Sequence, residues 1–567
     1  MWCVLGILPL LAWPVDSWST AKPNIVLVTM DAVRADRMGF LGAHPGLTPN
    51  LDRVAHESIV FTHAYSQSPV SVLSHATILT GLYPQTHRAS DLSVPLAGTL
   101  PYLPDLLRKA GYATAAFVST IALDPRNGPF QGYDRGFDVY DAGFHQPQRG
   151  ETRRQSVARN GEEAAARATK WMAGNKHRPF FLWVHLDDAD VAAPASYDRA
   201  VTASDAAIGK LASSLRSQSL YDDAVIVIAS AFGESLGAHG EDSHGMFLYD
   251  EVIHVPLLLK LPKSQSLGKQ VKARVRLVDV APAVLEQAGI PVPSQMQGQS
   301  LVRIAQSSSQ AEQPAYSRAD FPMQGFGCSV IESWRAGKYL YIHAPRPELY
   351  DTFVDPGATR NLAQTSKATL DTMASQLQAF DARLGNDSGK TGSSLSSSEM
   401  QKLASLGYVG LQNSSAGVQA ATVGTDPKDM IATVNRTIAA FRDLEDGKPE
   451  KAIPVLKQVL GSGSTVYLPQ FAMGSALFEQ QQYVDAVPYL HKAIELQPDS
   501  AWAHYTMGLT LMKTGDFKTA AVHLEIAAGR LPQFSAVHVA LAQAYERLGR
   551  TQEAARERAD ADHKKND

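Results

Sequence analysis

Cysteine, an excess of positive charge and long apolar runs are all scarce in this chain of 567 residues. Its two cysteines, Cys3 and Cys328, stand far apart and one lies in the leading segment, so a disulfide within the mature chain is not expected. The formal net charge of −4 argues against general nucleic-acid binding, which needs a basic face. The apolar run at the start, MWCVLGILPLLAW, is too short to cross a bilayer as a helix, so no membrane span is expected.

The same leading run has the length of the apolar region of a secretory signal, and the polar segment PVDSWSTAK follows it. Residues 1–21 are therefore predicted to be a signal peptide, and the protein is expected to be exported, periplasmic or extracellular. No lysine or arginine precedes the run, and no small-x-small cleavage site is evident. A cytoplasmic protein whose start is misassigned remains the alternative.

Strand-like and helix-like segments alternate over the first two thirds of the chain. Buried-looking strands alternate with amphipathic stretches, a pattern that predicts a mostly parallel sheet covered by helices on both faces. From about Pro314 to Arg383 the sequence becomes strand-rich, as expected of a smaller C-terminal sheet. The expected strands are Pro23–Met30, Ala113–Val118, Pro179–His185, Ala224–Ser230 and Val255–Lys260, and the expected helices include Asn160–Gly174 and Ala203–Ser217. The first domain is predicted to occupy residues 22–385.

A Gly/Ser-rich and irregular segment, residues 386–426, is predicted to be a linker. Beyond it, Gly474, Gly508 and Ala542 recur every 34 residues, and Pro498 and Pro532 close two of the units. This pattern resembles the tetratricopeptide repeat, in which small residues let paired helices approach. Residues 427–567 are therefore predicted to form an all-α solenoid of about four repeats. Such solenoids bind proteins or peptides, so a partner of that kind is expected.

The most informative stretch is AVIVIASAFGE, in which a buried-looking strand runs directly into Ala231 and Phe232. The end of a strand in an α/β sheet is where catalytic groups are usually placed. A methyl and a phenyl group can neither hold a cation nor move a proton.

Three stretches, PNIVLVTMDAVRAD, SVLSHATILTGLYPQTH and FGESLGAHGEDSHGMFLYDEV, together resemble the sulfatase branch of the alkaline phosphatase superfamily. RGFDVYD and ELYDTFVDPGATRNLA agree with it in order and spacing, and the resemblance covers nearly all of residues 23–383. It implies an alkaline-phosphatase-like α/β fold. It also implies a metal-activated nucleophile at a helix start that attacks a sulfate or phosphate ester.

The resemblance assigns Asp31 to the first metal carboxylate and Ser71 to the nucleophile, which also contacts the metal. It assigns Ala231 and Phe232 to two lost metal-ligand positions. The signature for formylglycine formation is absent, since Leu73 replaces its proline and His75 its arginine. Arg34, His185 and His244 match further active-site positions.

Each of these residues also has a simpler interpretation. Asp31 would serve equally as a turn or helix-cap carboxylate, and Ser71 or Ser74 as the N-cap of a helix over Val72–Thr80. Arg34 and His87 suit either an anion site or a structural hydrogen bond. Two further groups on loops have the same ambiguity. One loop either binds a metal of its own or hydrogen-bonds locally, through His239, Glu241, Asp242 and His244. A second loop is interpreted as acidic and solvated, and it contains Asp187, Asp188 and Asp190.

The sequence therefore favours a sulfatase-like protein with a degenerate metal site, catalytically impaired or inactive, whose repeats bind a protein. No cofactor is expected in this case. The alternative is an active hydrolase or transferase that acts on a sulfate or phosphate ester through Ser71, with calcium, manganese or zinc at a rebuilt site.

Overall fold

The computed structural model describes residues 22–42, 46–89, 96–125, 131–143, 159–190, 194–265, 267–307, 312–384, 424–461 and 466–566, with a few isolated positions between 396 and 406. The predicted signal peptide lies outside the described residues. So does most of the predicted linker. Among the described residues, no helix has the length and apolar character needed to cross a membrane.

A nine-stranded sheet forms the centre of the first domain, in the order β4-β3-β5-β1-β6-β7-β2-β8, with β9 also paired to β2. Strands β4, β3, β5, β1 and β6 run parallel, and β7 is antiparallel to both β6 and β2. The prediction of a mostly parallel sheet is thus confirmed. The strands are β1 Ile25–Met30, β2 Ile59–Tyr65, β3 Ala113–Phe117, β4 Val139–Asp141, β5 Phe180–Leu186, β6 Val225–Ser230, β7 His254–Lys260, β8 Gln270–Val271 and β9 Val275–Arg276.

Helices cover both faces of this sheet because the central strands are apolar on both faces. Ile25 and Leu27 of β1 belong to the core layer under α2, α4, α9 and α10, whereas Val26 and Val28 belong to the layer under α1, α6 and α7. The helices are α1 Pro49–Ala55, α2 Ser71–Thr80, α3 Pro84–His87, α4 Leu103–Lys109, α6 Gly161–Asn175, α7 Tyr197–Ser217, α8 Asp250–Ile253, α9 Val280–Gln287 and α10 Leu301–Gln306.

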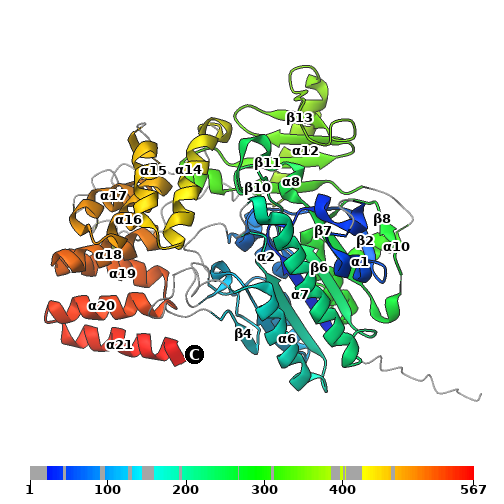
Figure 1. Cartoon of the computed structure of the whole chain (residues 1–567), viewed down its shortest axis with the longest axis horizontal. Helices are drawn as coiled ribbons and strands as arrows, with labels where there is room; N and C mark the ends of the chain where they lie inside the picture. The colour runs from blue at the N-terminus through cyan, green and yellow to red at the C-terminus, as the bar shows by residue number, and fades with distance from the viewer. Residues whose placement is uncertain are drawn as a thin grey trace, which may run out of the picture.

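A second, antiparallel sheet of four strands follows in the order β10-β11-β12-β13. It confirms the predicted small C-terminal sheet and lies at the top of Figure 1, beside α12. Its elements are β10 Ala315–Ala319, α11 Phe321–Phe326, β11 Ile331–Ala336, β12 Tyr339–His343, β13 Glu348–Asp351 and α12 Lys367–Leu384.

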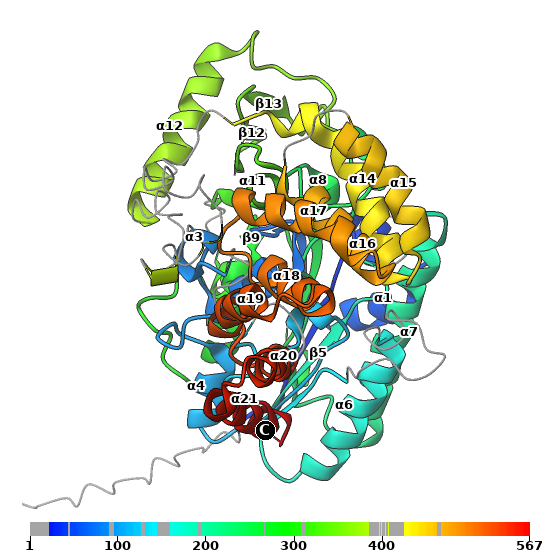
Figure 2. The ribbon, with the colours of Figure 1, turned by 90° about the vertical axis from the view of Figure 1, so that its left-hand side faces the viewer.

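The C-terminal part is a row of paired helices. Figure 2 shows the pairs stacked one after another from α14 and α15 to α20 and α21. Gly474 and Gly508 allow the close pairing, because a Cβ at either position would lie 2.6 Å from Cγ of Leu490 or Leu524. The helices are α14 Pro427–Glu445, α15 Pro449–Gly461, α16 Tyr467–Glu479, α17 Tyr483–Leu496, α18 Ala501–Thr514, α19 Phe517–Arg530, α20 Ser535–Arg547 and α21 Thr551–Asn566.

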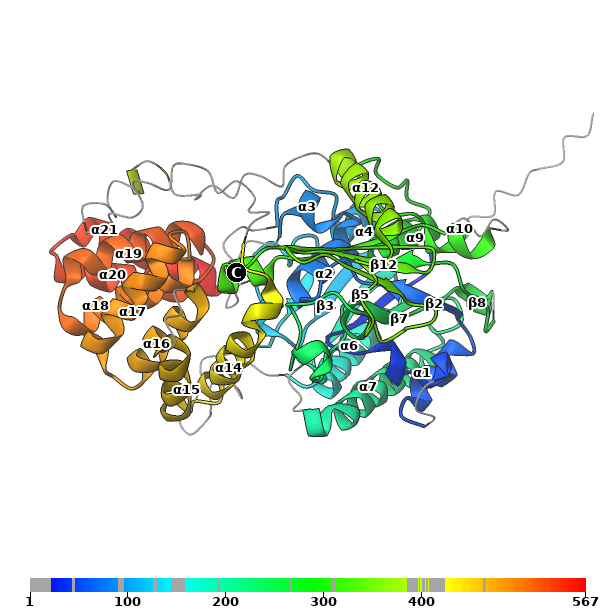
Figure 3. The same ribbon diagram turned by 90° about the horizontal axis from the view of Figure 1, so that it is seen from above.

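The C-terminal row of helices contacts the first domain through α14. Figures 1 and 3 place α14 directly against it. Val434 of α14 is buried in one apolar cluster with Met246, Phe247 and Phe326 of the first domain. The Asn435 side chain accepts a hydrogen bond from the Asp242 N–H (3.2 Å) and donates to the Gly240 carbonyl (2.8 Å). Helix α14 is therefore part of the same folded body as the loop after β6.

Candidate active site at the carboxyl ends of the central strands

Three neighbouring strands end at the candidate site. In the parallel register, Met30 of β1 pairs with Leu186 of β5 and with Ser230 of β6. Asp31 therefore follows β1 at the edge of the sheet where β5 ends, one residue after His185, and where Ala231 follows β6. The carboxyl ends of parallel strands are the usual location of a ligand site in such a sheet.

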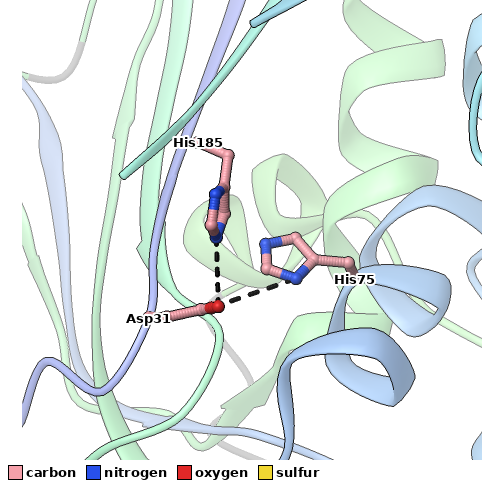
Figure 4. A group of neighbouring side chains, drawn as sticks. All are labelled: Asp31, His75 and His185. Atoms are coloured by element: carbon pink, nitrogen blue, oxygen red, sulfur yellow. Dashed lines mark ion pairs between the residues drawn. The ribbon is translucent and has the colours of Figure 1, made fainter. Parts of the chain in front are cut away.

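The Asp31 carboxylate is fully buried beside two imidazoles, as Figure 4 shows. One carboxylate oxygen is 3.0 Å from His185 Nε2, and the other is 4.0 Å from His75 Nδ1. Neither oxygen accepts a hydrogen bond of good geometry from a described residue. Burial acts to raise the pKa of Asp31, but the interactions of its carboxylate with His185, His75 and Ser71 outweigh burial and the pKa is lowered. Asp31 is therefore ionised.

Hydrogen bonds define the proton position on His75. Its Nδ1 lies 2.8 Å from the Ser71 carbonyl oxygen, which can only accept, so Nδ1 carries the proton. Its Nε2, 2.9 Å from the Thr29 hydroxyl, then accepts a hydrogen bond. Trp183 Nε1 donates to that same hydroxyl at 2.9 Å. Burial lowers the pKa of His75 to about 4, so the ring is neutral at physiological pH.

His185 shows the same arrangement with the opposite tautomer. The backbone N–H of Ser119 donates to His185 Nδ1 at 3.3 Å, so Nδ1 acts as the acceptor and the ring N–H lies at Nε2. Each imidazole thus turns an N–H, and not a lone pair, toward Asp31. A metal ligand must offer a lone pair. Asp31, His75 and His185 are close enough for a metal, but their hydrogen bonds do not present a ready-made site.

Ala231 and Phe232 are both fully buried. The Phe232 ring packs in the core layer under α7, with its centroid 4.5 Å from that of His244. The structure therefore places a methyl and an aromatic ring, with no ligand atom, beside the end of β6.

Ser71 is the first residue of α2, and Val70 occupies the N-cap position without a side-chain hydrogen bond. The prediction that Ser71 or Ser74 caps this helix is therefore wrong, because Ser74 instead donates to the Ser68 carbonyl at 2.8 Å. Ser71 Oγ lies 3.3 Å from His75 Nδ1. Since that nitrogen already carries a proton, it cannot act as the base for the Ser71 hydroxyl.

Arg34 is occupied by structural contacts. Its guanidinium pairs with Asp36 at 2.6 Å and donates to the carbonyl oxygens of Glu234 and Ser235 at 3.0 and 3.4 Å. It thus holds the loop after β6 in place. His87 is buried as well: Ala89 N–H donates to its Nδ1 at 3.1 Å, and its Nε2 lies 3.0 Å from Thr77 Oγ1. Neither side chain is free to meet an anion.

The loop between β6 and α8 hydrogen-bonds mainly within its own neighbourhood. Glu241 accepts from the Met246 N–H (2.7 Å) and from Ser235 Oγ (3.0 Å), and burial raises its pKa to about 8. His239 pairs with Glu251 at 3.2 Å and stacks on the Tyr249 ring. These two residues point to different partners, which favours local bonding over a shared metal site on this loop.

His244 turns toward the candidate site. Its Nδ1 lies 2.9 Å from a carboxylate oxygen of Glu234 and 3.5 Å from one of Asp190. Burial acts to lower the pKa of His244, but these two carboxylates outweigh it and raise the pKa to about 9. His244 is therefore an imidazolium at neutral pH. Glu234 is a site residue that the sequence did not single out.

The acidic loop after β5 differs from the predicted solvated loop in that Asp187 is buried, whereas Asp188 and Asp190 are partly exposed. Asp187 is only 6% exposed, and its pKa is raised well above the usual range by burial and by the charges of Asp190 and Asp31. Burial also raises the pKa of Asp190 to about 6. Asp188 accepts hydrogen bonds from the Gly161 N–H (3.0 Å) and Ser204 Oγ (3.1 Å). The loop folds inward because the N-terminus of α6 and the helix α7 supply these donors.

A cavity of about 600 Å³ lies over the acidic loop. Asp187, Asp190 and His244 form part of its lining, and Phe321 of α11 lines it as well. The opposite wall comes from the C-terminal row of helices: Ile438, Phe441, Arg442 and Glu445 of α14, and Leu468 of α16. Arg442 also donates to Ser243 Oγ at 3.2 Å. No local signal could have revealed this wall, because about 200 residues separate α14 from the loop that it covers.

Comparison with protein families gives two groups of matches. Residues 23–290 match the family described as Sulfatase, and residues 240–382 match the C-terminal region of N-sulphoglucosamine sulphohydrolase. Residues 474–515 and 505–562 match families described as TPR repeat and Tetratricopeptide repeat.

Individual relatives agree with these families. The ulvan-active sulfatase of Formosa agariphila is 25% identical over 63% of this chain and 80% of its own length. The delta 4,5-hexuronate-2-O-sulfatase of Bacteroides thetaiotaomicron is 23% identical over 61% of this chain and 85% of its own length. Among solved structures, the phosphonate monoester hydrolase of Agrobacterium radiobacter aligns with a TM-score of 0.53 at 20% identity, covering 64% of this chain and 96% of its own. That likeness concerns the fold.

Proposed function

Because the chain carries a sulfatase-family domain followed by tetratricopeptide repeats, we propose that this domain is catalytically impaired and that the repeats bind a protein or peptide. The family normally uses a divalent metal. Here two of the positions that the family resemblance assigns to metal ligands hold Ala231 and Phe232, both fully buried. This is the observation that carries the proposal.

The hydrogen bonds around Asp31 support it. A cation at the family position would need ligands from the end of β6, where this chain offers a methyl and a phenyl group. His75 and His185 do not replace those ligands, since each directs an N–H toward Asp31. Ser71 then has neither a metal nor a base to lower its pKa, and an unactivated hydroxyl is a weak nucleophile.

The negative charge of the site also disfavours binding of a sulfate or phosphate ester. Asp190 lines the cavity, and Asp187 is buried next to it. A sulfate or phosphate ester would meet two acidic side chains there. An ester could still occupy the outer part of the cavity, near Arg442 and His244.

Hydrolysis of aryl sulfates and aryl phosphates tests the proposal. The purified full chain should show background rates with calcium, manganese or zinc added, and Ser71→Ala should leave any trace rate unchanged. Ser74→Ala, on the same helix, is the matched control. A measurable rate that Ser71→Ala abolishes and Ser74→Ala preserves would refute the impaired-enzyme proposal.

One observation favours the second candidate function, a metal-dependent hydrolase or transferase that uses Ser71. The two oxygens of Asp31 lack hydrogen bonds of good geometry close to the N-terminus of α2, where Ser71 lies. Such oxygens are suitable cation ligands. The Ser71→Ala assay decides between the two candidates, because only this alternative requires the hydroxyl.

The repeats carry the proposed binding function. Their paired helices form a row of the kind that presents an extended concave surface to a peptide or helix. Val484 is 75% exposed on α17 and, together with Val487 and Pro488, lines a shallow apolar hollow on the repeats. Affinity capture with the full chain, compared with a Val484→Asp variant, tests whether this hollow takes part in partner binding.

Export of the protein is part of the proposal. It rests on the apolar segment at residues 1–21, which has the length of a signal sequence. N-terminal sequencing of the protein from its native host tests it: a mature chain that starts near Lys22 supports export, and an intact Met1 contradicts it.

A further inference from the structure

We propose that the site holds one divalent cation, displaced from the family position and bound by the carboxylates of Asp31, Asp187 and Asp190. This inference goes beyond the proposed function, which requires no cation. It starts from geometry: one oxygen from each of the three carboxylates lies within 4.8 Å of the others. Three converging carboxylates are the hard oxygen donors that calcium, magnesium and manganese prefer.

Unpartnered buried atoms give the second, independent observation. Both oxygens of Asp31 and one oxygen of Asp187 are buried without a hydrogen bond of good geometry from the described residues, although His185 Nε2 lies 3.0 Å from one Asp31 oxygen. Asp31 is 1% exposed and Asp187 is 6% exposed. A buried carboxylate oxygen without a partner is costly, and most such atoms in folded proteins have one. A cation between these oxygens would satisfy all of them at once.

The neighbouring side chains favour this position over the family position. His185 directs its Nε2–H to Asp31 from 3.0 Å, a position from which an imidazole can orient a carboxylate that binds a metal. Phe232 and Ala231 close the side toward β6. Asp187 and Asp190 lie on the loop after β5 and line the neighbouring cavity.

The charge balance and the access route agree with a cation. Four carboxylates, Asp31, Asp187, Asp190 and Glu234, surround the position, and His244 is the close cationic group, paired with the last two. Asp187 and Asp190 also line the cavity of about 600 Å³, which gives an ion a path from solvent. Arg442 lies on the opposite wall, where it binds Ser243.

Isothermal titration of the metal-free full chain with CaCl₂, MgCl₂ and MnCl₂ tests the inference. We expect one ion per chain for at least one of these salts. Asp187→Asn and Asp190→Asn should each weaken binding by more than about tenfold, because each removes a charged ligand. Asp188→Asn is the matched control: it lies on the same loop, but its carboxylate is bonded to Gly161 and Ser204. That control should stay within about threefold of the unsubstituted chain, the usual scatter of single contacts.

Thermal unfolding provides a second readout that does not depend on the heat of binding. An ion that binds only the folded chain raises the melting temperature of the unsubstituted protein, and the gain should disappear in folded Asp190→Asn. Asp190 is partly exposed, so this variant should fold even if the buried Asp187→Asn does not. The inference is overturned if no salt binds or if Asp190→Asn binds as well as the unsubstituted chain. It is also overturned if Asp188→Asn loses as much affinity as the ligand variants do.

The two proposals fail independently. Stoichiometric ion binding with background hydrolysis supports both of them. No ion binding with background hydrolysis overturns only the cation site. A rate that depends on Ser71 overturns the impaired-enzyme proposal, whether or not an ion is bound at Asp187 and Asp190.

Discussion

Replacing Gly508 by alanine tests how closely the repeat helices pack. Gly508 lies in α18, and a Cβ there would be 2.6 Å from Cγ and 2.8 Å from Cδ2 of Leu524 in α19. Such approaches are shorter than van der Waals contact, so one helix must move. Leu524 is fully buried in the solenoid core and has little space to turn away.

Two opposing effects decide the magnitude. Alanine is favoured over glycine inside a helix by about 1 kcal/mol. Inserting a methyl group into a packed core costs about 1–3 kcal/mol. Because the contact is with the branch point of a buried leucine, we expect a steric cost in the upper half of that range, about 2–3 kcal/mol, which leaves a net local loss of about 1–2 kcal/mol.

Hydrogen–deuterium exchange of peptides from α18 and α19 measures this loss directly. Exchange in the unsubstituted chain reports local opening, and a loss of that size should speed it by about five- to thirtyfold. Gly529→Ala in α19 is the matched control, because a Cβ there has no atom within 4 Å. The control should slow exchange or leave it unchanged. If Gly508→Ala slows exchange as the control does, the steric argument for the repeat glycines is wrong.

Two further predictions concern the repeats and their contact with the first domain. Burial lowers the pKa of His504 to about 4, below its unfolded value of about 6.5. The neutral ring therefore stabilises the fold fully above pH 6.5. This stability is lost between pH 6.5 and pH 4, at about 1.4 kcal/mol per pH unit, because the unfolded chain takes up a proton that the folded chain does not. Urea unfolding of the repeats between pH 7.5 and 5 should show this slope and His504→Asn should reduce it; an equal slope in both proteins contradicts the assignment. Asn435→Ala should remove two hydrogen bonds to the loop at Gly240 and Asp242, worth about 1 kcal/mol each. Hydrogen–deuterium exchange in residues 237–246 should therefore become faster. Arg436→Ala, which changes an exposed neighbour, should leave this exchange unchanged. Unchanged exchange in Asn435→Ala would show that apolar packing alone positions this loop.

The alternation of apolar strands and amphipathic helices was enough to predict the central sheet, because β1, β5 and β6 are apolar on both faces. The antiparallel direction of β7 was not predicted. Its sequence is as apolar as that of its neighbours, and direction depends on how the chain returns through α8. The repeats were predictable for a different reason: close packing at Gly474 and Gly508 restricts residue size at one position in every 34.

The candidate site was only partly predictable. The positions of Asp31, Ser71 and His185 at strand and helix ends follow from local patterns. The burial of Asp187 does not, since the donors to its neighbour Asp188 belong to α6 and α7. The tautomers of His75 and His185 depend on Thr29, Ser71 and Ser119, which only the fold brings together.

The apolar contact of α14 matters when the first domain is produced as a separate chain. Val434, together with Met430, Ile431 and Ile438, shields a patch of the first domain that includes Met246, Phe247 and Phe326. A chain that ends within residues 386–426 would expose that patch to water and would be prone to self-association. A shortened chain that keeps the first domain should therefore retain α14, which lies between the family matches that end at residue 382 and begin at residue 474.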